Sequence, residues 1–343
     1  FAGHSGASAR SIGPAEAGRW AAPWVWFPTM GRLQQFPAGE SWLLTQRCIL
    51  GRSRVCGVRL GELDVSGEHA SLRWTGAAWE LQDLHSRNGS WVDRRRLAAG
   101  ERVALTVGAV LGLGRPESLV LVDAAAPEAF AAPLGAGDPV VAQGGILALP
   151  GPTAPRLMIV PGPGGWMLER AGEAVAVADG EIVRLDSEAW QLHLPVQLPQ
   201  TQDSGASAPE LDGITLRFHV SRDEEYIELV ALHGSHAIDL KARSYHYTLL
   251  TLARARLRDA ALASEQRGWV QQSELLAMLR VDAGNLHLDI YRLRRQLGEA
   301  GIRDAARIVE RRAGTRQLRI GVARLEIHPL ASGHPSRDAE PGQ

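Results

Sequence analysis

Three short polar stretches in the first third of the chain carry residue types that bind anions. They are Gly51-Arg52-Ser53, Ser66-Gly67-Glu68-His69 and Ser86-Arg87-Asn88-Gly89-Ser90. Arginine offers a charged, planar fork of donors that can grip two oxygens at once, and serine adds a hydroxyl donor. Since Gly, Ser and Asn favour turns between strands, the pattern predicts three loops suited to hold a multivalent anion.

Alternating segments beside these stretches predict the strands that position them. Trp79–Leu84 alternates apolar and polar residues with the period of two that is typical of a half-buried strand. Ala70–Trp74 repeats this pattern, with Ala70, Leu72 and Trp74 on one face. Many short strands separated by turn signals predict an all-β sandwich.

The ordered set of stretches resembles the forkhead-associated (FHA) domain, a phosphothreonine reader whose pattern is Gly-Arg, then Ser-x-x-His, then Ser-x-Asn-Gly-Ser/Thr. The resemblance covers about a quarter of the chain and agrees with a β-sandwich. It implies that a phosphopeptide is bound by Arg52, Ser66, Arg87 and Asn88, with support from Gly51, His69, Ser86 and Gly89. His69 would tie loops together, and Gly89 would supply an unusual backbone angle.

Gly67 departs from the family, which commonly has Arg directly after the Ser of Ser-x-x-His. The departure removes a side chain near the expected site, so an FHA-like sandwich that no longer binds phosphate is the alternative. The joint presence of the four implied binding residues favours a working site.

Composition fits an ordinary soluble protein with several domains, because 343 residues include 45% hydrophobic and 22% charged residues. The net charge of −1 hides an asymmetry. Residues 243–320 hold 15 Arg against 8 Asp and Glu, a net charge of +7, which leaves −8 for the remainder. A basic module on an acidic body indicates a nucleic-acid partner for that module.

Other functional classes find little support in the sequence. Cys48 and Cys56 form neither a disulfide framework nor a metal-ligand spacing, and we expect buried reduced thiols. No catalytic motif or paired carboxylates stand out, so we expect no enzymatic activity, no metal and no cofactor. No apolar run approaches the roughly 20 residues that span a bilayer, and residues 1–20 lack the apolar centre of a signal peptide. We therefore expect a cytoplasmic protein without a membrane partner.

Shifts in composition divide the chain into seven parts. We expect a disordered tail (1–23), the FHA domain (24–123), an Ala/Pro/Gly linker (124–139), a small degenerate β-module without phosphate loops (140–198), a polar linker (199–210), an α+β domain (211–330) and a loose tail (331–343).

The α+β domain begins with strands and continues with helices predicted near 245–257, 273–279 and 285–297. Leu286, Ile290, Leu293 and Leu297 form the apolar stripe of the third helix, and a hairpin with the basic tip 311–315 follows. This order resembles the winged-helix effector domain of OmpR/PhoB-type response regulators. The best local match is NLHLDIYRLRRQL at 285–297, the counterpart of the recognition helix.

The resemblance implies that helix 285–297 enters a DNA major groove. The implied contacts are Asn285, Leu288, Asp289 and Arg292 to bases, Arg294 and Arg295 to phosphates, and Arg311, Arg312 or Arg316 from the wing. Asp289 stands where the family usually has His. A carboxylate there would accept from a cytosine amine or repel the DNA backbone.

Together these patterns predict a phosphothreonine-dependent bacterial transcriptional regulator. A partner protein phosphorylated by a Ser/Thr kinase would bind the sandwich, and the winged helix would bind double-stranded DNA. A homodimer would place its half-sites about one helical turn, ~10 bp, apart. The alternative is a phospho-dependent scaffold whose winged helix binds protein.

Overall fold

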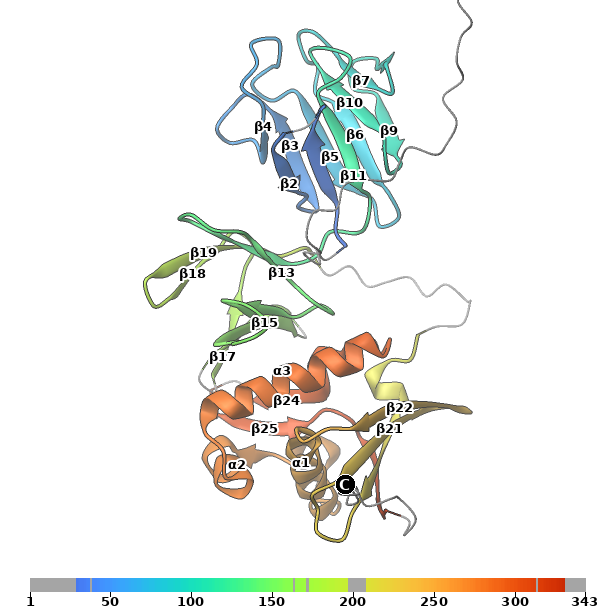
Figure 1. Ribbon diagram of the computed structural model, residues 1–343, viewed down its shortest axis with the longest axis vertical. Coiled ribbons are helices and arrows are strands. Elements are labelled where there is room, and N and C mark those ends of the chain that lie inside the picture. Colours follow the sequence, from blue (N-terminus) through green and yellow to red (C-terminus); the bar gives the residue numbers. More distant parts are fainter. Residues whose placement is uncertain are drawn as a thin grey trace, which may run out of the picture.

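The computed structural model describes residues 29–37, 39–162, 164–170, 173–196, 208–312 and 314–330. The predicted terminal tails and most of the predicted polar linker at 199–210 lie outside these residues. Figure 1 shows a β-sandwich at one end, a smaller β-module in the middle and a mixed α/β unit at the other end.

The N-terminal sandwich is built from two sheets, as the alternating segments predicted. In spatial order the first sheet contains β2 (Ser41–Leu43), β1 (Arg32–Gln35), β11 (Leu119–Asp123), β10 (Val110–Leu113), β7 (Ser90–Val92) and β8 (Arg95–Arg96). The second contains β4 (Val58–Arg59), β3 (Arg47–Gly51), β5 (Ala70–Trp74), β6 (Trp79–Asp83) and β9 (Arg102–Leu105). Trp79 and Leu81 of β6 are fully buried between the sheets.

The middle module contains two four-stranded sheets. One consists of β13 (Val140–Val141), β12 (Phe130–Pro133), β19 (Glu188–His193) and β18 (Ile182–Leu185). The other consists of β14 (Leu147–Leu149), β15 (Leu157–Gly162), β16 (Gly165–Arg170) and β17 (Glu173–Val177).

The linker predicted over 124–139 is wrong in its central part. Phe130–Pro133 forms β12, which pairs along its length with β19, and both Ala129 and Ala131 are buried. Small apolar residues fit a tightly paired strand as well as they fit a linker, so their composition alone could not distinguish the two.

The C-terminal unit combines two sheets with three helices. The sheets are β22 (His236–Ala242), β21 (Ile227–His233), β20 (Thr215–Val220) and β26 (Arg324–Pro329), and then β23 (Val270–Gln271), β25 (Gln317–Ile320) and β24 (Val309–Arg312). The helices are α1 (His246–Arg258), α2 (Gln272–Leu279) and α3 (Ala283–Glu299). Strand β26, which pairs in parallel with β20, was not predicted.

Helix α3 buries two stripes instead of the one that its sequence predicts. Leu286, Ile290, Leu293 and Leu297 pack into the core of the C-terminal unit as expected. The side chains of His287, Tyr291 and Arg294, at the helical spacing i, i+4, i+7, are also buried. They lie toward the middle module, whose strand β15 runs near α3 in Figure 1.

Strand β15 explains how the middle module reaches α3. Leu157 and Ile159 point into the core of the middle module, whereas Met158 and Val160 join the core of the C-terminal unit. Successive residues of a strand face opposite sides, so a continuous apolar run can serve two cores. The middle module and the C-terminal unit therefore share an apolar interface.

Candidate functional site

The three predicted loops meet at one end of the N-terminal sandwich. Strand β3 ends at Gly51, and the next two residues bind the second loop through their backbone. The Arg52 N–H donates to Ser66 O at 2.9 Å, and the Ser53 N–H donates to Gly67 O at 2.9 Å. A Cβ on residue 51 would lie 2.3 Å from Gly67 O, so this approach requires glycine.

His69 connects the second loop to the third, the tying role that the sequence implied. Its ring is fully buried. Nδ1 accepts the Ser66 N–H at 3.0 Å, and Nε2 lies 2.9 Å from Gly89 O. Because a carbonyl only accepts, Nε2 must carry the proton and donate. Burial lowers the pKa of His69 against the opposing hydrogen bond to Gly89, so the ring is neutral at pH 7.

Asp83 organises the third loop and was missed at the sequence level. This buried carboxylate accepts from Ser86 Oγ at 2.6 Å, from Ser90 Oγ at 2.7 Å and from the Ser86 N–H at 3.2 Å. Burial raises its pKa, but these hydrogen bonds outweigh burial and hold the pKa below the ordinary value. The available signal was a carboxylate at the inward-facing end of β6, just before a turn rich in serine.

The side chains of the remaining binding residues differ in exposure and in the hydrogen bonds that they already make. Arg52 is exposed and donates through Nε to Val65 O at 3.3 Å. Arg87 is exposed, and its N–H donates to Ser66 Oγ at 3.0 Å. Neither arginine forms an ion pair with any residue that the structure describes. Asn88 Nδ2 donates to Asp64 O at 2.7 Å, so this amide already braces the second loop.

The arrangement can hold a tetrahedral anion at the loop surface. Arg52 keeps its two terminal amino groups for a ligand, Ser66 keeps its hydroxyl proton, and Arg87 adds a second cation. Gly89 has a φ of +95°, which explains the glycine in the third loop. The structure thus brings together all eight residues that the sequence assigned to this site.

Comparison with known proteins identifies this module. The model of the FHA domain family matches residues 48–114, which include all three loops. The N-terminal sandwich contains an FHA domain. FHA domains bind phosphothreonine-containing proteins. Strands β2, β1 and β11, which lie outside the matched residues, complete the first sheet.

Several solved structures are similar to this part of the chain. The FHA domain of FhaA, complexed with the intracellular domain of Rv3910, is 29% identical, with 26% of this chain and 97% of that chain covered and a TM-score of 0.24. The FHA domain of CT664 from Chlamydia trachomatis is 23% identical, with 27% and 96% covered and a TM-score of 0.25. Mycobacterium tuberculosis EmbR in complex with a low affinity phosphopeptide is 23% identical, with 28% and 25% covered and a TM-score of 0.26. A search of curated proteins finds no match.

Gly67 of the FHA domain leaves room for the cation that the family commonly carries there. A Cβ built on Gly67 has no heavy atom within 4 Å, and the backbone needs no positive φ. We predict that Gly67→Arg tightens binding of a phosphothreonine peptide about five- to tenfold, since one partly exposed charge-assisted bond adds about 1 kcal/mol. Titration calorimetry against Gly67→Gln, which has similar reach without charge, measures the effect. Equal affinities of the two variants would contradict this reading.

Several of the residues predicted to contact DNA lie at the surface, either exposed or in ion pairs. Asn285, Arg292 and Arg312 are exposed, although Asn285 also takes part in the N-cap through Asp282. Arg295 pairs with Glu299 at 3.1 Å and stays half-exposed. Arg316 pairs at 2.8 Å with Glu173 of the middle module.

Two of the predicted base contacts, Leu288 and Asp289, are half-buried against the C-terminal unit itself. Asp289 accepts from Thr248 Oγ1 of α1 at 2.9 Å, and burial raises its pKa. Leu288 packs against the core of the C-terminal unit. Helix α3 presents these positions toward its own domain, because they border the apolar stripe.

Arg294 and Arg311 are buried around Glu169 of the middle module. Arg294 was predicted to contact DNA phosphates, and Arg311 was predicted to contact DNA from the wing. The side chain of Arg294 is 1% exposed and makes two 2.8 Å bonds to the Glu169 carboxylate, which is 5% exposed. Arg311 Nε binds the same carboxylate at 3.1 Å. We call these three residues the Glu169 cluster. Their charges are satisfied inside the protein, so they cannot meet DNA phosphates in this conformation.

Two further features concern metals and membranes. Cys48 and Cys56 are free and buried, and burial raises the pKa of Cys48 to about 12. In the ranges that the structure covers, no group of three or more His, Cys, Asp or Glu could hold a metal ion. Among the same residues, no helix is both long and apolar enough to cross a bilayer.

Proposed function

We propose that this protein is a phosphothreonine-dependent transcriptional regulator. Its FHA domain binds a partner phosphorylated by a Ser/Thr kinase, and its C-terminal unit acts as a winged helix that binds double-stranded DNA. The observation that carries the proposal is the convergence of Arg52, Ser66 and Arg87 on one loop surface, held by the neutral ring of His69. A doubly charged phosphate ester offers three acceptor oxygens to such a set.

The DNA-binding half draws support from the order of the elements and their charge. Helices α2 and α3 are followed by the β24–β25 hairpin, the succession in which a winged helix carries its recognition helix and wing. Asn285, Arg292 and Arg312 lie on exposed surface, within the segment whose net charge is +7. The two arginines among them suit the phosphate backbone of a duplex.

Release of the middle module is part of the proposed function. The module covers the stripe of His287, Tyr291 and Arg294 on α3 and holds Arg311 of the hairpin. A helix that enters a major groove needs an open face. Docking of a phosphorylated partner would therefore shift the protein toward a form in which α3 is uncovered. The regulator would act in the cytoplasm, as a homodimer on DNA and without catalysis or cofactor.

Arg292→Ala tests the DNA-binding half. In mobility shifts of the full-length chain with genomic duplex fragments, we expect affinity to fall about tenfold and the salt slope to drop by about 1. Arg217→Ala removes the same charge from β20, where Arg217 pairs with Glu326 at 2.7 Å, and should leave binding unchanged. Failure of the wild-type chain to bind any duplex, with or without its phosphorylated partner, would rule out this half.

The burial of Arg294 and Arg311 favours one alternative, a phospho-dependent scaffold in which α3 binds protein. Two of the cations expected on DNA are neutralised internally by Glu169. A scaffold retains binding of phosphothreonine peptides by the FHA domain, has no affinity for duplexes and is insensitive to Arg292→Ala. The mobility shifts above therefore separate the two functions.

A further inference from the structure

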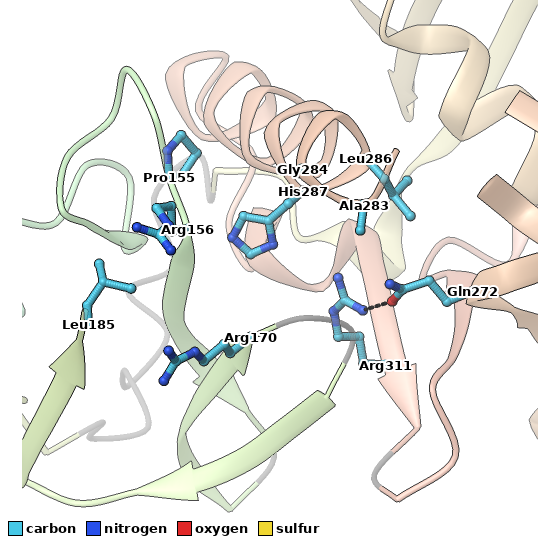
Figure 2. Close-up of a pocket in the computed structure, with 10 residues that line it drawn as sticks. All are labelled: Pro155, Arg156, Arg170, Leu185, Gln272, Ala283, Gly284, Leu286, His287 and Arg311. Carbon is cyan, nitrogen blue, oxygen red and sulfur yellow. Dashed lines mark hydrogen bonds between the residues drawn. The ribbon is translucent and has the colours of Figure 1, made fainter. Parts of the chain in front are cut away.

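A cavity lies where the middle module meets α3 and the β24–β25 hairpin. Its volume is about 280 Å³. Arg156 and Arg170 line it from the middle module, and Gln272, His287 and Arg311 line it from the C-terminal unit. Figure 2 shows the nitrogen-bearing ends of these side chains around one space. The cavity is far from the FHA loops in the fold, and it lies at the contact between the middle module and α3 that the proposed function requires to open.

The charges around the cavity do not balance. Arg170 forms no ion pair with a described residue and donates only to Arg184 O at 3.2 Å. Arg311 shares one carboxylate, Glu169, with Arg294. Arg156 is the exception, since it pairs with Asp186. One excess positive charge is therefore buried in the Glu169 cluster. Arg170, which is exposed, adds a second charge that has no carboxylate partner among the described residues. A buried charge of this kind requires a counterion.

His287 provides an independent indication of a ligand site. His287 is only 7% exposed, and its Nε2 is buried without a hydrogen-bond partner among the described residues. The ring points into the cavity (Figure 2). Burial, followed by the charge of Arg311, lowers the pKa of His287 to about 4, so the ring is neutral and can still donate one N–H. Buried polar groups without a partner are rare enough to require an explanation.

The start of α3 contributes less than these side chains. Ala283 and Gly284 line the cavity at the positive end of the helix dipole. However, the Asp282 carboxylate already accepts the Asn285 N–H at 2.7 Å and caps the helix. The arginines and His287 are therefore the main hydrogen-bond donors of the cavity.

We propose that this cavity binds a small anion that carries a phosphate group. Donors approach from two sides, Arg156 and Arg170 on one and His287, Gln272 and Arg311 on the other. A tetrahedral phosphate group with three acceptor oxygens can meet several such directions, whereas one arginine fork satisfies a carboxylate. Pockets for drug-sized ligands start at about 300 Å³, so this one suits a smaller molecule. Because the ligand bridges two modules, its binding strengthens the contact of the middle module with α3.

The FHA domain also binds phosphate groups, so the test needs a protein in which that site is silenced. The full-length Arg52→Ala protein is titrated by calorimetry with inorganic phosphate, glycerol phosphate and succinate. We expect phosphate or glycerol phosphate to bind and succinate to bind at least tenfold more weakly. The tighter of the two phosphates tells whether the ligand is the free ion or a monoester. The proposal is overturned if neither inorganic phosphate nor glycerol phosphate binds, or if succinate binds with equal strength.

A second substitution locates the site. Adding Arg170→Gln to the Arg52→Ala protein should weaken phosphate binding at least tenfold. Arg184→Gln is the matched control, because Arg184 is exposed, lies on β18 and does not line the cavity. The imidazole NMR signal of His287 should also shift on phosphate addition. Unchanged affinity in Arg170→Gln, or a stationary His287 signal, contradicts the assignment without touching the proposed role of the FHA domain.

Discussion

Replacement of Arg52 by alanine is expected to weaken binding of a phosphothreonine peptide by at least a hundredfold. The guanidinium is exposed, is oriented through its Nε bond to Val65 O and has no carboxylate partner among the described residues. It can therefore make two charge-assisted hydrogen bonds to one phosphate, each worth about 1.5–3 kcal/mol. Their loss totals about 3 kcal/mol or more, which is more than two orders of magnitude in Kd.

Arg73→Ala is the matched control for this experiment. Arg73 lies toward the far end of β5, pairs with Glu80 at 2.8 Å and is half-exposed. Its removal changes the net charge equally, and surface pairs of this kind contribute little to stability. Fluorescence anisotropy with one labelled peptide compares the two variants. Similar affinities for both would mean that Arg52 is not the phosphate ligand.

Glu169→Gln is expected to loosen the middle module from α3. The substitution keeps the shape of the side chain but leaves Arg294 and Arg311 buried without a counter-charge. Removal of one partner from a buried ion pair typically costs about 3–5 kcal/mol. Hydrogen exchange should accelerate in residues 287–294 of α3 and in β24, while exchange in the FHA domain stays unchanged. If the proposed function holds, DNA affinity also rises.

Glu173→Gln provides the comparison, because Glu173 lies on the neighbouring strand β17 and pairs with Arg316 at the surface. Both side chains of that pair are more than 60% exposed, so the variant should leave exchange in α3 as it is in the wild type. Slow exchange in α3 of Glu169→Gln, equal to that of Glu173→Gln, would show that the Glu169 cluster does not hold the module.

The charge state of Glu169 sets the pH at which this comparison is made. Burial raises its pKa, but Arg294 and then Arg311 outweigh burial and lower the pKa to about 2. A carboxyl whose pKa is depressed by folding stabilises the folded form above its ordinary pKa of 4.5, and this contribution is lost as pH falls toward 2. The cluster is therefore fully charged at neutral pH, where the glutamine variant is measured.

The FHA site could be predicted from the sequence because its residues lie in short turns next to strands with a clear period of two. Local patterns of this kind place Arg52, Ser66 and Arg87 at loop tips without knowledge of distant contacts. Asp83 escaped prediction because a charged residue at the end of an alternating strand is ordinarily a surface residue. Its burial depends on hydroxyls from Ser86 and Ser90 that form only when the turn closes.

The covered face of α3 could not be predicted from its own sequence. The apolar stripe was read correctly, but the burial of Arg294 depends on Glu169, which is 125 positions away in the chain. One signal was present in the continuous apolar run from Leu157 to Val160, which is typical of a strand buried on both faces. That run indicates a second partner for the middle module without saying which surface it covers.

The most direct test of the account is a titration of the full-length chain with paired peptide libraries, identical except for phosphorylation of a central threonine. We expect the phosphorylated library to bind with micromolar affinity, about −8 kcal/mol, and its unphosphorylated counterpart to show no measurable heat. Equal binding of the two libraries would contradict the claim that the three loops recognise a phosphate group.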